Sequence, residues 1–241
     1  MRSVTSTRLA ASDRPAQELL RSSALLSHLS ARARDEVVAA TAIEHVPART
    51  MLLREGEPPQ WIHLVLEGLV RLFTTAGNRQ ITLTILRAPT LVPAEMIDLQ
   101  APAPVSACTL RRAHLGRIAI ADATRLLLRE REFAGLAQRQ LAAHWRDLLC
   151  EVKSLRAHTS FQRLVAWILA MHRLGSGPID LPYDKSVLAA RLGMAPETLS
   201  RDFARLSSLG VSVKGRRLDI ADPRLLETLA GFAGASLPPV P

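Results

Sequence analysis

Apolar and polar residues follow different patterns in different parts of the chain, and each pattern predicts a different kind of structure. Residues 17–40 have apolar side chains at helical spacing, which predicts one or two short helices. From about residue 43 to residue 120, short apolar or alternating runs such as WIHLVLEGLVRLF and ITLTIL are separated by turn residues. Short strands at this spacing predict a small antiparallel barrel or sandwich.

Helical periodicity returns after residue 121. Residues 122–156 contain no proline and a single glycine, and their apolar residues step by four, three, four and three. That spacing is the seam of two helices packed side by side. The alternative is an amphipathic helix that faces its own core. We favour a dimerisation helix, because it would follow a β domain. The seam consists of Leu141, Trp145, Leu148, Val152 and Leu155.

The stretch from 183 to 220 predicts two short helices and a hairpin. Lys185 to Leu192 forms the first helix, Gly193 supplies the tight turn, and Pro196 stands at the start of the second helix, where its missing N–H costs nothing. At 100° per residue, one face of the second helix is apolar and suits a core. That face consists of Leu199, Phe203 and Leu206.

The opposite face of this second helix presents a carboxylate, a hydroxyl and a guanidinium, from Glu197, Ser200 and Arg201. Such groups read base edges in the DNA major groove: arginine pairs with guanine, glutamate accepts from cytosine, and serine adapts to several edges. A hairpin with a basic tip follows, and basic side chains there suit phosphates. The alternative is a helical hairpin with a solvated charged face. The order of helix, glycine turn, helix and basic hairpin disfavours that alternative. From these elements we expect phosphate contacts by Arg205, Lys214 and Arg216.

The amino-acid composition excludes several classes of protein but does not by itself indicate a function. The 241 residues have a net charge of +9, which is compatible with a polyanion partner but equally with a solvated basic surface. Only Cys108 and Cys150 are present, which excludes a disulfide scaffold, a four-cysteine iron–sulfur cluster and a cysteine-built zinc site. No apolar run approaches the roughly 18 residues of a membrane span, and the N-terminus does not resemble a secretory signal. We therefore expect a soluble cytoplasmic protein without a membrane partner.

The sequence contains none of the common catalytic motifs. There is no nucleophile elbow, phosphate-binding loop, dinucleotide fingerprint or zinc-protease motif. We therefore expect no enzyme activity.

The segment PETLSR at 196–201, inside LAARLGMAPETLSRDFARLSSLGV, resembles the recognition helix of the CRP/FNR superfamily of bacterial transcription regulators. Glu197, Thr198 and Arg201 match the family's Glu-(Thr/Ser)-x-x-Arg core, and Ser200 is similar to the FNR branch. Pro196 departs from the family, which often has an arginine or a small polar residue there. The resemblance implies further phosphate contacts from Lys185 and Thr198.

EGEPPQWIHLVLEGLVRLF resembles a conserved segment of the family's sensing domain. The resemblance therefore implies an α+β chain with three parts. Residues 1–121 would form a sensor of short helices and a cyclic-nucleotide-binding-type β-barrel (jelly roll), 122–156 the dimerisation helix, and 157–241 a winged helix-turn-helix. It implies a homodimer on double-stranded DNA with half-sites resembling TTGAT and ATCAA one helical turn apart, and RNA polymerase as a partner.

The family's cyclic-AMP site uses a Gly-Glu pair and a downstream Arg-(Ser/Thr) pair that binds the phosphate. The corresponding pairs here are Ala94-Glu95 and Val105-Ser106, which we take as the candidate effector pocket. Valine cannot neutralise a phosphate, so the pocket lacks a charge-assisted contact. We expect no physiological cyclic-AMP binding.

LVPAEMIDLQAPAPVSACTL, at 91–110, is similar to the DNR/NnrR branch, whose members are associated with nitric oxide, haem and denitrification. That similarity implies haem b as a cofactor. Haem needs an axial ligand, most often histidine. His63, in an apolar strand, and His144, beside the seam, are the two candidates among seven histidines. A buried structural histidine is the alternative for each. A sensor of another gas or small ligand, and a ligand-independent regulator controlled by its abundance, remain open.

Overall fold

A computed structural model describes residues 14–77, 79–93, 101–174 and 177–230. The chain divides into two compact units, and each is described by itself. The first unit comprises residues 1–75 and 85–144, and the second comprises residues 76–84 and 145–241. The division between the units falls after His144, within the segment that the sequence assigns to the dimerisation helix.

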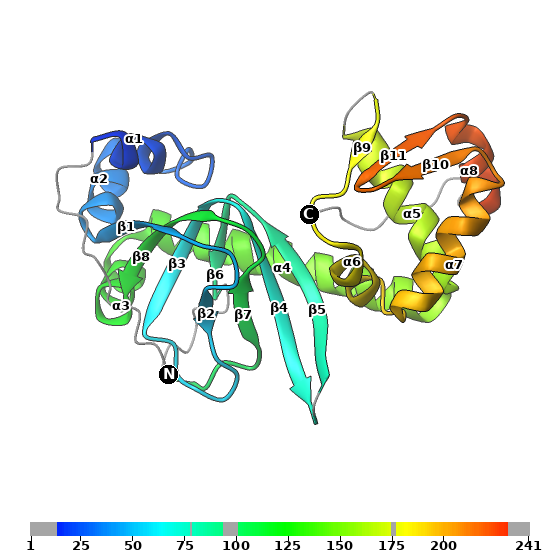
Figure 1. Ribbon diagram of the computed structural model, residues 1–241. Helices are drawn as coiled ribbons and strands as arrows, with labels where there is room; N and C mark the ends of the chain where they lie inside the picture. The colour runs from blue at the N-terminus through cyan, green and yellow to red at the C-terminus, as the bar shows by residue number, and fades with distance from the viewer. Residues whose placement is uncertain (1–13, 78, 94–100, 175–176, 231–241) are drawn as a thin grey trace. The chain divides into compact units, whose positions relative to one another are not determined.

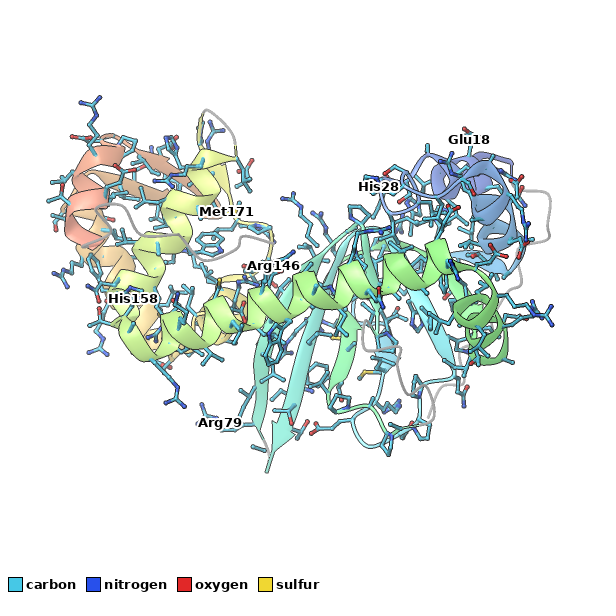
Figure 2. The ribbon with its side chains drawn as sticks, turned by 180° about the vertical axis from the view of Figure 1, so that it is seen from behind. Glu18, His28, Arg79, Arg146, His158 and Met171 are labelled. Carbon is cyan, nitrogen blue, oxygen red and sulfur yellow. The ribbon has the colours of Figure 1, made fainter. Side chains whose placement is uncertain are left out.

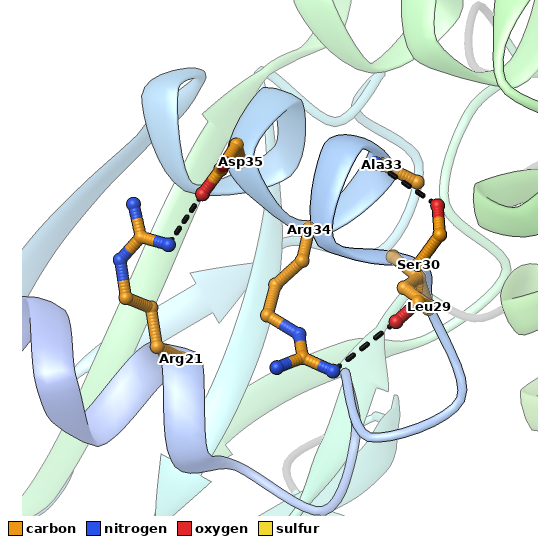
Figure 3. A network of polar contacts seen from close by, with 6 residues as sticks. All are labelled: Arg21, Leu29, Ser30, Ala33, Arg34 and Asp35. Carbon is orange, nitrogen blue, oxygen red and sulfur yellow. Dashed lines mark hydrogen bonds and ion pairs between the residues drawn. The ribbon is translucent and has the colours of Figure 1, made fainter.

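Two short helices precede the strands of the first unit, α1 (Arg14–Ser22) and α2 (Ala31–Ala39). Ser30 caps α2, because its hydroxyl accepts a hydrogen bond from the backbone N–H of Ala33 at 3.3 Å. An ion pair joins Arg21 of α1 to Asp35 of α2, and Arg34 donates to the carbonyl of Leu29 at 3.1 Å (Figure 3). These contacts hold the two helices and the turn between them together.

Eight described strands form two antiparallel four-stranded sheets in the first half of the chain (Figure 1). One sheet has the order β1-β8-β3-β6 and the other the order β2-β7-β4-β5, which makes the predicted barrel a two-sheet sandwich. The strands are β1 (Thr41–Val46), β2 (Met51–Leu53), β3 (Trp61–Glu67), β4 (Leu69–Ala76), β5 (Arg79–Arg87), β6 (Thr90–Val92), β7 (Ser106–Thr109) and β8 (Ala113–Ala119).

Strand β3 is buried on both of its faces. Ile62, Leu64 and Leu66 join a core cluster formed with the helices, whereas Val65 joins the core between the two sheets. Burial of both faces explains why β3 is a nearly continuous apolar run. By the alternation of side chains along a strand, His63 lies on the same inner face as Val65. The predicted runs miss β1, which is mostly half-exposed, and β6, which has only three residues.

The prediction of one continuous helix over 122–156 is wrong. The segment forms α3 (Ile120–Arg129) and α4 (Arg131–Ala157), and Glu130 between them adopts an extended conformation at φ −110° and ψ 98°. Redirecting the chain at Glu130 allows Leu126 of α3 and Phe133 of α4 to enter the same core cluster. Beyond this break, α4 is a single helix of 27 residues (Figure 2).

The second unit contains a helix-turn-helix and a small sheet. Its elements after α4 are α5 (Ser160–Arg173), β9 (Ile179–Asp180), α6 (Lys185–Arg191), α7 (Pro196–Ser207), β10 (Val211–Lys214), β11 (Arg217–Ile220) and α8 (Pro223–Ala230). The predicted helices and hairpin are present, and β9 extends the hairpin to a three-stranded sheet in the order β10-β11-β9. Every residue of α5 from Leu164 to Ala170 is buried, so this helix forms the centre of the unit.

Among the described residues, no helix is long and apolar enough to cross a membrane.

Candidate nucleic-acid interface

Helix α7 has one buried and one exposed face. Leu199, Phe203 and Leu206 are almost completely buried, at 1%, 6% and 0% exposure, and they anchor the helix in the second unit. Glu197, Ser200 and Arg201 are all exposed. The burial of the apolar face therefore decides that the polar side chains point outward, where a base edge can reach them.

The exposed face begins at the first turn of α7. Pro196 stands in that turn, and Ala195 before it makes no side-chain cap. The guanidinium of Arg201 donates a hydrogen bond to the hydroxyl of Thr198, with 3.3 Å between Nη2 and Oγ1. Glu197 lies one turn earlier on the same face as Arg201, since residues four apart are neighbours on a helix. The structure thus gathers the three residues that match the family's core pattern.

The turn between α6 and α7 depends on glycine. Gly193 has φ +62°, and a Cβ atom there would lie 2.6 Å from Cδ2 of Leu155. Arg163 of α5 holds this turn: its Nε donates to the carbonyl of Leu192 at 2.8 Å and its Nη2 to the carbonyl of Gly193 at 3.3 Å. The same guanidinium donates to the carbonyl of His158 at 2.7 Å. Sequence reasoning misses Arg163, because an arginine on an amphipathic helix carries no signal of a backbone clamp.

A buried ion pair connects α6 to α4. The guanidinium of Arg191 lies 3.2 Å from the carboxylate of Glu151, and the two side chains are 5% and 13% exposed. The hydroxyl of Thr84 on β5 donates a further hydrogen bond to Glu151 at 3.0 Å. Burial raises the pKa of Glu151, and the charge of Arg191 and the hydrogen bond from Thr84 oppose that rise. This group holds the first helix of the helix-turn-helix, and nothing in the sequence pattern indicates it.

Three of the residues expected at phosphates already have contacts within the protein. Arg216 forms an ion pair with Asp184 at 3.0 Å and donates to the carbonyl of Leu181 at 2.8 Å. The guanidinium of Arg205 lies 3.9 Å from the ring centre of Phe161, and Nζ of Lys185 lies 5.4 Å from the ring centre of Phe203. These contacts orient cationic groups that are still exposed. Lys214 is also exposed, at the end of β10.

The predicted seam on α4 is an exposed apolar stripe. Trp145 is 61% exposed, and Leu148, Val152 and Leu155 are 36%, 47% and 49% exposed. Leu141 is half-buried, and the predicted seam omits Leu149, which is also exposed. Leu155 additionally contacts the turn at Gly193 within its own chain. Exposed apolar side chains on one long helix are typical of a surface that a partner covers.

The candidate effector pocket is only partly described. Ala94 and Glu95 lie outside the described residues. Val105 is half-buried, and the hydroxyl of Ser106 on β7 accepts a hydrogen bond from the backbone N–H of Glu55 at 3.1 Å. The serine hydroxyl therefore has a structural role in this conformation.

The two candidate haem ligands have different environments. His63 is 4% exposed, its Nδ1 has no hydrogen-bond partner among the described residues, and burial lowers its pKa to about 4. Nε2 of His144, in contrast, has a partner and lies 2.8 Å from the hydroxyl oxygen of Thr90. Burial also lowers the pKa of His144. Both histidines are therefore neutral at pH 7, and only His63 has an unpaired buried nitrogen.

Two family profiles match the chain. Residues 162–229 match a Crp-like helix-turn-helix domain, and residues 43–130 match a cyclic nucleotide-binding domain. The chain is similar in fold to FixK2 from Bradyrhizobium japonicum, with a TM-score of 0.68 and 17% identity over 78% of this chain and 96% of that one.

Two other solved structures are similar. The c-di-GMP responsive regulator CLP of Xanthomonas campestris has a TM-score of 0.68 and 17% identity, over 80% of this chain and 100% of that chain. A proposed cAMP-binding regulatory protein of Silicibacter pomeroyi DSS-3 has a TM-score of 0.56 and 28% identity, over 89% of this chain and 97% of that chain. No curated protein sequence matches the chain.

Proposed function

We propose that this chain, a DNA-binding transcription regulator of the CRP/FNR type with a cyclic-nucleotide-binding-like sensing domain, reads an FNR-like pseudo-palindrome through the exposed face of α7. The observation that supports the proposal is the outward placement of Glu197, Ser200 and Arg201 by the buried opposite face. Arg201 would pair with a guanine and Glu197 with a cytosine amino group, as these side chains do in major-groove recognition. The half-sites would resemble TTGAT and ATCAA.

A homodimer fits this mode of DNA binding, because two α7 helices spaced one turn of the DNA apart match a two-fold symmetric site. The exposed stripe of α4 supplies the apolar surface for the second copy. RNA polymerase is the expected protein partner of a regulator bound in this way.

DNA binding can be tested by fluorescence anisotropy with a TTGAT–ATCAA duplex and with a duplex in which the guanine of each half-site is replaced. Arg201→Ala should weaken binding to the first duplex by about 1–3 kcal/mol and should reduce the difference between the two duplexes. Lys214→Ala should weaken binding to both duplexes alike and should lower the salt slope by about one. Arg224→Ala, at an exposed arginine on α8, is the matched control and should leave affinity and specificity unchanged. Unchanged specificity in Arg201→Ala would refute the assignment of the reading face.

The signal that this regulator senses is a separate proposal. Val105 supplies no charge for a phosphate, so the charge-assisted contact of the family's pocket is missing. The oxygen of Ser106 accepts a hydrogen bond from the backbone N–H of Glu55, which leaves its O–H able to donate. We therefore propose that cyclic AMP is not the physiological ligand. Micromolar affinity for cyclic AMP in calorimetry would contradict this.

Haem b with nitric oxide as the signal is supported by the resemblance of residues 91–110 to the DNR/NnrR branch. In the described conformation neither candidate histidine fits a haem iron: the ring of His144 is bonded to Thr90, and His63 is enclosed between the sheets. The described residues form a surface hollow beside Arg111 in the first unit and another beside Trp167 in the second unit, and neither histidine lines either of them. Reconstitution decides the question. A Soret band that shifts with nitric oxide and is lost in His63→Ala but kept in His28→Ala would support haem, and the absence of any Soret band would remove it.

A ligand-independent regulator is the second candidate. The cyclic-nucleotide pocket has lost its phosphate-neutralising residue, so the domain can serve as a scaffold whose output depends on the amount of protein. Full affinity of the purified, ligand-free dimer for its site would favour this candidate over a ligand-switched regulator.

A further inference from the structure

Three turns of the β-sandwich meet around one hollow in the first unit. They are the β3–β4 turn at Gly68, the β5–β6 turn at Ala88, and the β7–β8 turn at Arg111 and Arg112. A hydrogen bond from the N–H of Ala88 to the carbonyl of Gly68, at 3.2 Å, joins the first two turns. The N–H of Leu110 donates to the carbonyl of Leu69 at 2.9 Å and joins the first to the third. The backbone around the hollow is therefore held in place.

Gly68 limits how this turn can be built. It has φ +117°, and a Cβ atom there would lie 2.7 Å from Cβ of Ala113. Both the backbone angle and the close approach exclude a side chain at this position. The turn is thus a tightly packed backbone segment, and the side chains that reach the hollow come from the residues around it.

Those side chains are predominantly cationic. Arg87, Arg111 and Arg112 line the hollow, together with one carboxylate, Glu67. Glu67 in turn pairs with Nδ1 of His114 on β8. Among the described residues that line the hollow, arginines outnumber carboxylates three to one, so the lining carries an excess of formal positive charge. Its volume is about 350 Å³, within the range of sites that hold small molecules.

We propose that this hollow binds a small anion that carries at least two phosphate or carboxylate groups. Arginine favours such groups because its planar fork donates paired hydrogen bonds to two oxygens at once. Arg111 and Arg112 are adjacent on one turn, so each can engage an anionic group of the same molecule. None of the residues that line this hollow belongs to α7 or to the segment 94–106 that resembles the family's nucleotide-binding pairs. The proposal is therefore independent of DNA recognition.

Isothermal titration of the full-length protein with inorganic pyrophosphate, at low ionic strength, tests this proposal. The double variant Arg111→Gln/Arg112→Gln should lower the affinity for pyrophosphate by at least about tenfold, since charge-assisted hydrogen bonds are lost. The single variants Arg111→Gln and Arg79→Gln each remove one positive charge and form a matched pair, with Arg79→Gln as the control. Arg79 is an exposed residue at the start of β5 (Figure 2) and is not among the residues that line the hollow. The control should retain affinity within about twofold. Because Arg111 and Arg112 are exposed, the double variant should keep the wild-type thermal unfolding curve.

Equal pyrophosphate affinity of the wild-type protein and the double variant would overturn the proposal. A loss of affinity in Arg79→Gln equal to the loss in Arg111→Gln would also overturn it, because it would indicate attraction by net charge alone. The affinity of the double variant for the TTGAT–ATCAA duplex is measured as a second test. If the double variant binds pyrophosphate normally but loses DNA affinity, these arginines contact the DNA backbone and the small-anion site is refuted. If α7 does not read DNA at all, the pyrophosphate result is unaffected.

Discussion

Removal of Arg191 from its buried pair with Glu151 should strongly destabilise the second unit. The two side chains are only 5% and 13% exposed, so water cannot replace the lost partner. Arg191→Met keeps most of the apolar volume and leaves the carboxylate of Glu151 buried without its cation. Breaking one side of a buried ion pair costs about 3–5 kcal/mol.

A matched control lies in the same unit. Arg173 and Glu227 form an ion pair at 3.1 Å, but their side chains are 61% and 46% exposed. An exposed pair contributes about 0–1 kcal/mol, so Arg173→Met should have a small effect. The comparison separates burial from charge, because both variants remove one arginine from one carboxylate at nearly the same distance.

The effect of Arg191→Met should depend on pH in a defined direction. Burial already raises the pKa of Glu151 above its ordinary value of 4.5, and Arg191 opposes this rise. Without Arg191 the pKa rises further. When the pKa of a carboxyl group is higher in the folded than in the unfolded state, its contribution to the stability of the folded state is fully present below the unfolded pKa. That contribution is lost as the pH rises through the folded pKa. The gap between wild type and variant should therefore be small near pH 4.5 and should widen towards pH 7.

Urea unfolding, followed by tryptophan fluorescence, measures these differences. Replacing Trp61 and Trp145 with phenylalanine in every protein compared leaves the buried Trp167 as the reporter. Glu151→Gln and the double variant Glu151→Gln/Arg191→Met complete a double-mutant cycle. The double variant should be more stable than the sum of the two single losses indicates, because it leaves no unpaired charge buried. Single losses below about 1 kcal/mol that add within about 0.5 kcal/mol would refute the reasoning.

Three further predictions concern other parts of the chain. Leu148→Glu should place a charge in the exposed stripe of α4 and shift the dimer to monomer in sedimentation equilibrium, whereas an unchanged mass would contradict the seam. Gly193→Ala should cost about 1–2 kcal/mol in urea unfolding because of its φ of +62°, and part of this cost should disappear in a Leu155→Ala background, where the 2.6 Å contact is absent. The buried His63 has a pKa of about 4, whereas the ordinary value is 6.5. The free energy of unfolding of the first unit should therefore fall by up to about 3 kcal/mol as the pH drops from 6.5 to 4. His63→Leu should remove this pH dependence, and an equally steep loss in that variant would show that other groups cause it.

The local pattern of residues was sufficient to predict α7 and its buried face. Pro196 and the spacing of Leu199, Phe203 and Leu206 define a helix and its buried face, and the periodicity of 3.6 residues then places Arg201 outside. The same reasoning failed between 122 and 156, where Glu130 divides α3 from α4. Nothing near Glu130 breaks a helix in the sequence. The break serves packing, because both helices contribute side chains to one core.

The sequence by itself predicted the helices of the helix-turn-helix, the apolar stripe of α4 and the exposed polar face of α7, because each follows from the spacing of neighbours along one helix. Only the tertiary structure decided what those elements contact. Arg163 on the turn at Gly193, Glu151 against Arg191, and the arginines of two separate β turns around one hollow all join residues distant in the chain. Periodicity reports which face of an element is apolar, but the partner of that face depends on how the whole chain packs.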